Sequence, residues 1–336
     1  MARDGDTGAD GDSDSVELDR RTYDLLRLIG VNEPIGSIRL VEQMRRRGYS
    51  IKGRTIRLLL SELDEAGLTA KVSGKGRRLT DAGRAELQRG DVSGRLERVR
   101  ERIATLTSRV TYDPVEDGGE LVVGAGRVVP DGAERAFDLL ERLHDSGVGP
   151  VLAAREADDE PGLRLAFPSS ITLDGVLLSR GIDSRLVTAG LVEYDGGVRR
   201  YIDAINGEGA TMDVVHLLVD ADRTEVGRYL DGGTGVLVVD NREFPLTRFE
   251  EARDLSEAVR GRLGGVLDLR RPRESGPFPA GTPGWEFASL TYGGAGETAL
   301  ALLHENGLLA EWESLDGLRA RAAFEPAPAL RDATPR

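Results

Sequence analysis

The chain of 336 residues has no cysteine, which excludes disulfides, thiolate zinc sites and a cysteine nucleophile. Its three histidines, His144, His216 and His304, lie far apart in the sequence, which argues against a transition-metal site. No segment approaches the roughly 20 consecutive apolar residues of a membrane helix, and the first residues are acidic and polar, unlike a signal peptide. We therefore expect a cytoplasmic protein with no membrane partner, no metal and no other cofactor.

Lysine is also scarce, with only Lys52, Lys71 and Lys75 among 45 basic residues, and the net charge is −13. The charge is divided unevenly along the chain. Residues 17–110 carry 21 basic and 13 acidic side chains, whereas residues 111–336 carry 23 basic and 40 acidic ones. This asymmetry predicts one basic module that contacts phosphate, attached to an acidic domain that does not.

Neither glycine-rich phosphate motif is present: no strand leads into GxGxxG, and GxxxxGK[ST] does not occur. The sequence also offers no catalytic triad and no paired acid and base at a telling spacing. These absences disfavour nucleotide-driven chemistry, and we expect a protein that is not an enzyme.

The chain is expected to divide into five segments. They are an acidic disordered tail (1–16), a winged-helix DNA-binding domain (17–90), a linker or dimer helix (91–108), a regulatory domain (109–320) and a flexible tail (321–336).

Three helices and a hairpin are predicted in the basic segment. The first helix starts at Leu18 and breaks at Gly30, and the second spans Ser37 to Arg47 with Ile38, Val41 and Met44 inward. The third follows Ser50, a good N-cap residue, and its apolar residues at i, i+3, i+4 and i+7 form one stripe that faces a core. These residues are Ile56, Leu59, Leu60 and Leu63.

The third helix would enter the major groove, because a helix-turn-helix places the first turns of its second helix near base edges. Arginine reads guanine with its planar fork, so Arg54 and Arg57 are the predicted base-reading residues. A strand at 68–72, a turn at 73–77 and a returning strand form the predicted wing. A solvated helix face is the alternative explanation for exposed arginines. The predicted DNA-binding set is Lys52, Arg54, Thr55, Arg57, Lys75, Arg77 and Arg78.

Beyond residue 108, short strands alternate with helices, which favours an α+β fold with a ferredoxin-like α/β plait over a doubly wound sheet. Strands are expected near 109–113, 120–129, 148–154, 163–167, 185–193, 197–202, 235–240 and 263–269. Helices are expected near 131–146, 171–180, 222–231, 248–261 and 295–307.

Two segments of this domain are candidates for a ligand site. Hydroxyl side chains precede a helix start in residues 169–182, where free backbone N–H groups favour an anion. Residues 240–245 end a strand with an arginine beside an asparagine, which suits a carboxylate. The predicted ligand-binding residues are Ser170, Thr172, Asn241 and Arg242, for which helix capping and an ordinary ion pair are the alternative roles.

These two segments, behind a winged helix, resemble the archaeal nitrogen repressor NrpR family. Residues 207–213 and 233–245 are further points of similarity, while Ser169, Asp174 and Val214 depart from residues common in the family. The resemblance covers residues 18–94 as the winged helix and residues 95 to about 318 as a single regulatory copy. Scarce lysine, the absence of cysteine and an acidic surface suggest either a salt-rich cytosol or a GC-rich genome, and the first of these would make the chain a haloarchaeal-like member.

The resemblance implies a repressor of nitrogen-assimilation genes that binds a palindromic operator as a homodimer. It also implies 2-oxoglutarate as the small-molecule effector that releases DNA. Two alternatives stay open from the residues: a winged-helix-fused enzyme acting on a small carboxylate, and an RNA-binding adaptor.

Overall fold

The computed structural model describes residues 20–90, 92–157, 160–207, 210–279 and 281–332. The chain forms two compact units that meet in sequence between Arg95 and Leu96, and each is described by itself. The predicted tail at 1–16 and the start of the first helix at Leu18 lie outside the described residues. Among the helices that are described, none combines the length and apolar character required to span a membrane.

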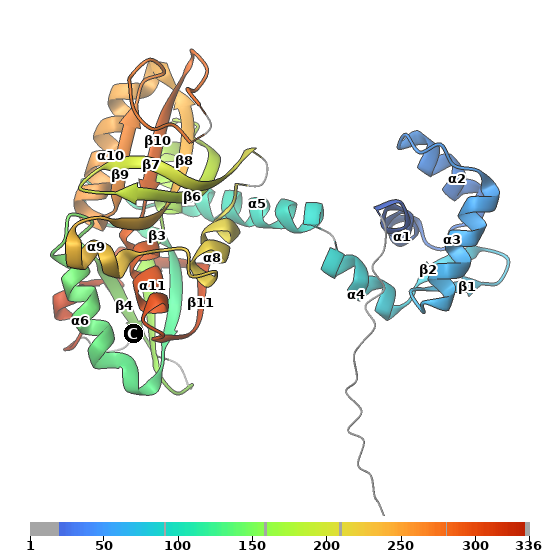
Figure 1. Cartoon of the computed structure of the whole chain (residues 1–336), viewed down its shortest axis with the longest axis horizontal. Coiled ribbons are helices and arrows are strands. Elements are labelled where there is room, and N and C mark those ends of the chain that lie inside the picture. The colour runs from blue at the N-terminus through green and yellow to red at the C-terminus, as the bar shows by residue number, and fades with distance from the viewer. Residues whose placement is uncertain (1–19, 91, 158–159, 208–209, 280, 333–336) are drawn as a thin grey trace, which may run out of the picture. The chain divides into compact units, whose positions relative to one another are not determined.

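The first unit is a three-helix core with a two-stranded wing (Figure 1). Buried leucines and isoleucines of the three helices pack into one core with Leu68, which precedes the hairpin, and Leu79, the last residue of its second strand. The winged-helix prediction is confirmed at this level. The elements are α1 (Arg20–Asn32), α2 (Ser37–Arg46), α3 (Gly53–Glu65), β1 (Thr69–Val72), β2 (Gly76–Leu79) and α4 (Asp81–Gly90).

Three local predictions for this unit were wrong. Helix α1 continues through Gly30 to Asn32, because the absence of a side chain lets Gly30 pack closely against Leu79. Helix α3 starts after Lys52 with no side-chain cap, so Ser50 does not cap it. Ile38 is 85% exposed, since the buried face of α2 is instead formed by Leu40 and Met44.

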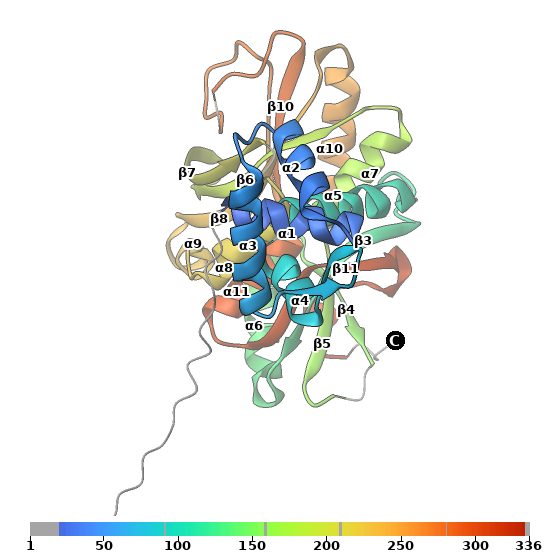
Figure 2. The same ribbon diagram turned by 90° about the vertical axis from the view of Figure 1, so that its right-hand side faces the viewer.

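The second unit contains two five-stranded antiparallel sheets with helices packed against them (Figures 1 and 2). Its strands are β3 (Glu120–Val128), β4 (Leu152–Glu156), β5 (Leu163–Pro168), β6 (Arg185–Tyr194), β7 (Val198–Asn206), β8 (Gly235–Pro245), β9 (Val266–Arg270), β10 (Phe287–Gly293), β11 (Leu309–Ala320) and β12 (Glu325–Pro326). The boundary between the two units falls within α5 (Val92–Arg109). The other helices of the second unit are α6 (Ala133–His144), α7 (Ile171–Ser179), α8 (Met212–Asp220), α9 (Val226–Gly232), α10 (Phe249–Leu263) and α11 (Ala295–Glu305).

The strand orders are β7-β6-β8-β10-β9 and β11-β3-β5-β4-β12. Each sheet holds a split β-α-β unit: β3 and β4 flank β5, and β8 and β9 flank β10. Helix α11 contacts β3 and β5 of one sheet and β8 of the other. It is buried along nearly its whole length, which explains why most of its residues are apolar.

The mixed α/β content was predicted, but the elements differ in several places. Residues 109–113 form no strand, and α8, β10 and β11 were missed. The predicted flexible tail at 321–336 packs on the domain as far as it is described. Leu330 is fully buried, and β12 pairs with β4.

Candidate nucleic-acid interface and buried regulatory network

The exposed face of α3 carries the predicted base-reading residues. Lys52, Arg54 and Arg57 are exposed and Thr55 is half-buried, because Ile56, Leu59, Leu60 and Leu63 turn the opposite face into the core. The Nε–H of Arg57 donates to the carbonyl oxygen of Gly53 at 3.2 Å. Within the described residues, Arg54 forms no salt bridge, so its donors are available to a ligand.

The wing is held in place by its glycines. Gly74 and Gly76 have φ values of +66° and +117°, which favour glycine in this turn. A side chain at Gly76 would lie 2.1 Å from the carbonyl oxygen of Ile35, with which the strand pairs through Arg77. Lys75 and Arg78 are exposed on the hairpin.

Arg77 is paired within the protein, unlike the free side chain that the sequence predicted for a phosphate contact. Its guanidinium pairs with both oxygens of Asp64, with Nε at 3.1 and 3.0 Å, and is 17% exposed. Burial alone would raise the pKa of Asp64, but hydrogen bonds from Arg77 and Thr69 and the charges of Arg77 and Lys71 lower it. Arg77 therefore fixes the wing to α3. Because its guanidinium is occupied by Asp64, the role predicted for it as a DNA contact is replaced by a structural one.

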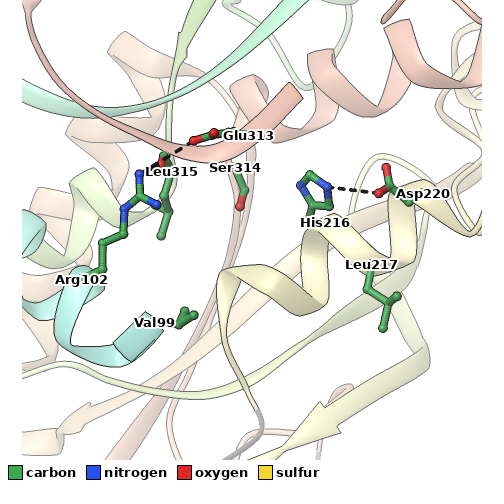
Figure 3. Close-up of a pocket in the computed structure, with 8 residues that line it drawn as sticks. All are labelled: Val99, Arg102, His216, Leu217, Asp220, Glu313, Ser314 and Leu315. Atoms are coloured by element: carbon green, nitrogen blue, oxygen red, sulfur yellow. Dashed lines mark hydrogen bonds and ion pairs between the residues drawn. The ribbon is translucent and has the colours of Figure 1, made fainter. Parts of the chain in front are cut away.

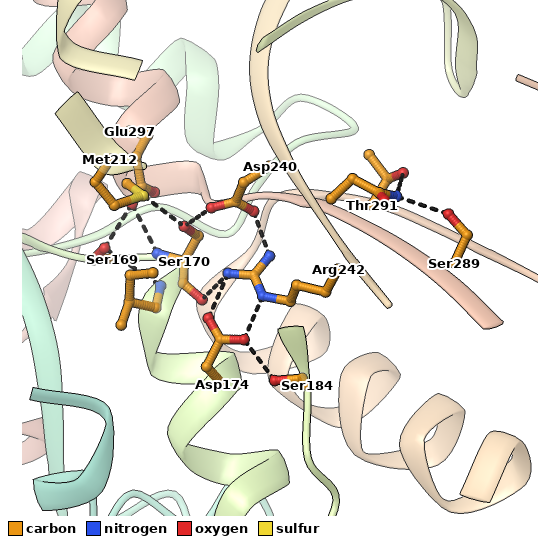
Figure 4. Close-up of polar contacts among 12 residues, drawn as sticks. Ser169, Ser170, Asp174, Ser184, Met212, Asp240, Arg242, Ser289, Thr291 and Glu297 are labelled. Carbon is orange, nitrogen blue, oxygen red and sulfur yellow. Dashed lines mark hydrogen bonds and ion pairs between the residues drawn. The ribbon is translucent and has the colours of Figure 1, made fainter. Parts of the chain in front are cut away.

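The regulatory domain buries a guanidinium at its centre (Figure 4). Arg242 on β8 is 0% exposed, and its Nε and Nη2 donate to the two oxygens of Asp174 on α7 at 2.6 and 2.7 Å. Its Nη1 donates to Asp240, and the hydroxyl of Ser170 donates to the other oxygen of Asp240 at 2.6 Å. The carboxylate partners predicted for Arg242 are thus supplied by the protein itself.

The other predicted ligand-binding residues also have protein partners. The hydroxyl of Thr172 donates to the backbone carbonyl of Val122 at 3.1 Å, and the Val122 N–H donates back to it. The amide of Asn241 donates to the hydroxyls of Ser289 and Thr291 at 2.8 and 2.9 Å. The structure therefore brings Ser170 and Arg242 into one network but does not gather all four residues around a common space.

Sequence reasoning missed Glu297 on α11, which extends this network. Its Oε1 accepts from the hydroxyl of Ser169 and the N–H of Ser170 at 2.7 and 2.8 Å, while Oε2 is buried without a partner among the described residues. Burial, followed by the nearby charge of Asp240, raises the pKa of Glu297 to about 7. Only its place in an otherwise apolar helix hints at this role in the sequence.

A surface pocket of about 390 Å³ lies between α5, α8 and β11 (Figure 3). Its polar side chains are engaged with one another. His216 lies 3.1 Å from Asp220 and stacks on Trp312, and Arg102 donates to the carbonyl of Leu315. These pairings favour a structural role for the pocket walls.

No group of three or more histidine or acidic side chains suited to a metal ion is found in the described part of the chain.

A basic recognition helix and wing, followed in the chain by a two-sheet domain, define a winged-helix transcription regulator. The family model for the NrpR regulatory domains NRD1 and 2 matches residues 96–325, more than half of the chain. The chain therefore belongs to the NrpR regulatory-domain family. The model for the ribonuclease R winged-helix domain matches residues 24–87.

Named proteins from archaea are similar to this chain. The global nitrogen regulator NrpRI of Methanosarcina mazei is 28% identical, over 80% of this chain and 89% of that protein. The global nitrogen regulator NrpR of Methanocaldococcus jannaschii is 27% identical, over 72% of this chain and 45% of its own length. A crystal structure of a nitrogen repressor-like protein from Methanococcus jannaschii matches 68% of this chain and 98% of that one, with 20% identity and a TM-score of 0.50. This structural likeness supports the fold alone.

Proposed function

We propose that this protein is a DNA-binding repressor of nitrogen-assimilation genes. The observation that carries the proposal is the exposed, basic N-terminal half of α3 on a winged helix that precedes an NrpR regulatory domain. Arg54 and Arg57 would read guanine, at roughly 1–3 kcal/mol for each bidentate pair. Lys52, Thr55, Lys75 and Arg78 would contact the DNA backbone nearby. The names of the relatives support the choice of nitrogen genes.

The operator is proposed to be palindromic and bound by a homodimer, because two-fold symmetry in the protein matches two-fold symmetry in the site. Two recognition helices would then address half-sites roughly 34–36 Å apart. A small metabolite such as 2-oxoglutarate would relieve repression by changing that spacing.

The regulatory domain is proposed to be built from two plait-like halves. The split β-α-β unit in each of its two sheets supports this construction.

The test measures binding to duplexes from upstream of nitrogen-assimilation genes, after footprinting of bound genomic sites. The double variant Arg54→Ala and Arg57→Ala should bind its operator at least tenfold more weakly than wild type and lose discrimination against unrelated duplexes. The matched control is Arg228→Ala with Arg253→Ala, which removes two exposed helical arginines from the regulatory domain. Equal operator affinity for both double variants would refute the proposal.

An RNA-binding role is the second candidate, because the ribonuclease R winged-helix model matches residues 24–87. Competition between the operator duplex and an RNA duplex of the same sequence separates the two functions. Preference for RNA would overturn the repressor assignment.

A fused enzyme acting on a small carboxylate is the remaining alternative. A turnover assay with small carboxylates tests it, and the regulator names of the relatives disfavour it.

A further inference from the structure

Helix α3 exposes one of its large apolar side chains. Leu58 is 60% exposed, whereas the remaining leucines and the isoleucine of the helix, all of which are described, are buried in the core. A single exposed leucine is ordinary on a protein surface. Its meaning therefore depends on its neighbours on the helix.

Leu58 lies on the same face of α3 as Arg54, which is predicted to read a base. Residues four apart in a helix point to the same side, and both of these side chains are exposed. Arg57, which is also exposed, directly precedes Leu58 in the chain. If the face that carries Arg54 enters the major groove, the leucine enters with it.

The charge along α3 limits the part of the helix that can approach DNA. Its N-terminal half is basic, whereas the half beyond Leu58 carries three carboxylates, which phosphate repels. These acidic residues are Glu62, Asp64 and Glu65. The hydroxyl of Ser61 donates to one of them, Glu65, at 3.2 Å. Leu58 therefore lies at the end of the surface that suits DNA.

The chemistry of the major groove identifies the base that matches a leucine. Every base edge there presents hydrogen-bond donors or acceptors, and only thymine adds an apolar group, its C5 methyl. Leucine has no polar side-chain atom, so packing it against a polar edge would leave that edge without a hydrogen bond. Contact with the thymine methyl instead removes the apolar surface of both groups from water.

We propose that Leu58 is a specificity-determining residue that packs against the C5 methyl of a thymine near the guanine read by Arg54. The inference rests on the proposed function and deepens it by naming a second base of the half-site. Four residues of helix rise by roughly 6 Å, and successive bases of a strand are about 3.4 Å apart. The thymine is therefore expected within about two base pairs of the guanine.

The experiment replaces each thymine of the bound operator by uracil, one at a time, which removes the methyl and keeps the hydrogen-bonding groups. Fluorescence anisotropy with full-length protein measures affinity. One such replacement should weaken binding by wild type about fourfold, the effect of one buried carbon group. Leu58→Ala, and Leu58→Asn with nearly the same shape, should bind the thymine and uracil operators equally. Thermal unfolding of both variants should match wild type, because the side chain is exposed.

Two further variants are matched controls. Leu217→Ala removes an equally exposed leucine from α8 of the regulatory domain. Thr55→Ser removes a methyl from α3 itself, at a half-buried position. Both variants should keep the wild-type preference for thymine over uracil.

The outcomes separate this contact from the proposed function. If wild type binds its operator but no uracil replacement weakens binding, the methyl contact is overturned and the repressor assignment stands. A uracil effect that persists in Leu58→Ala, or that disappears in Thr55→Ser or Leu217→Ala, would also overturn the role of Leu58. Failure of wild type to bind any footprinted duplex would instead refute the proposed function, and the contact with it.

Discussion

In the interior of the regulatory domain two carboxylates pair with a single guanidinium, and a third carboxylate belongs to the same hydrogen-bonded network. Asp174, Asp240 and Glu297 share Arg242 as the only basic side chain in the network drawn in Figure 4, and all four side chains are buried. Removing charges from water is costly unless they are paired and hydrogen-bonded. Glu297 does not contact Arg242 in this network, and burial and the nearby charge of Asp240 raise its pKa.

Glu297→Gln should remove a pH dependence of stability. The folded pKa is about 7 against an ordinary value of 4.5, so the folded state holds a proton that the unfolded state releases. Stability from this group is fully present below pH 4.5 and is lost as pH rises through 7, by about 3 kcal/mol. Urea unfolding between pH 5 and 8 measures the difference between wild type and variant.

The matched control is Glu257→Gln, an exposed glutamate on α10. It should follow the wild-type pH profile, because the substitution lies outside the buried network and leaves Glu297 in place. The raised pKa of Asp240 acts in the same direction, so a smaller residual slope is expected in Glu297→Gln. An unchanged slope in that variant would contradict the assignment.

Arg77→Met should weaken the winged helix and change its response to acid. Loss of the paired guanidinium is expected to lower the free energy of unfolding by about 1–3 kcal/mol. Because pairing lowers the pKa of Asp64 below its ordinary 3.8, this stabilisation is present above that value and is lost as pH falls through the folded pKa. Hydrogen exchange of residues 69–79 measures it.

Arg78→Met, at the adjacent exposed position, is the control for this prediction. It should leave hydrogen exchange in the wing unchanged and weaken DNA binding modestly, because an exposed arginine is replaced. Equal protection of the wing in both variants would show that the Arg77–Asp64 pair does not hold the hairpin.

At the scale of secondary-structure elements, α7 packs closely against the residue that follows α5. A side chain at Gly175 would place its Cβ 2.3 Å from the Cβ of Val110, just beyond the end of α5. The glycine therefore permits the close approach that brings Asp174 beside Arg242.

Gly175→Ala should destabilise the regulatory domain by about 1–3 kcal/mol through overpacking. Gly261→Ala is the matched control, because Gly261 also lies in a helix, α10, and an added side chain meets nothing within 4 Å. That control should be stabilising by roughly 0.5–1 kcal/mol, as alanine favours helices over glycine. Chemical denaturation measures both, and a neutral Gly175→Ala would contradict the packing argument.

Element prediction succeeded where one apolar face is buried. Helix α3 was predicted from its i, i+3, i+4 and i+7 spacing because that face alone meets the core. Strands β10 and β11 were missed because tertiary pairing decides them: β10 lies between β8 and β9, and β11 is an edge strand with register shifts. Arginine and glutamate in β11 obscure its alternation.

At the scale of the whole molecule, the separation of charge predicts how DNA affinity depends on salt. Basic residues concentrate in 17–110 while the remaining chain is acidic. Affinity should therefore depend on a few phosphate contacts and fall steeply as salt is added. Lys75 and Arg78 are exposed basic residues of the wing.

Lys75→Ala with Arg78→Ala should reduce the slope of log affinity against log salt concentration by about two, one for each phosphate contact removed. Fluorescence anisotropy with full-length protein measures the slope. The regulatory-domain pair Arg228→Ala and Arg253→Ala should leave it unchanged, although it alters net charge equally. Equal slopes in the two double variants would indicate that bulk charge governs affinity.

The sequence alone determined the winged helix, the exposed basic face of α3 and the family, because these depend on short-range periodicity and on local composition. Tertiary structure decided which charges are free. Arg77 and Arg242 look like ligand-binding arginines in the sequence, yet Asp64, Asp174 and Asp240 meet them in the fold. The pairings with Asp64 and Asp174 join segments distant in the chain, so no local pattern reveals them.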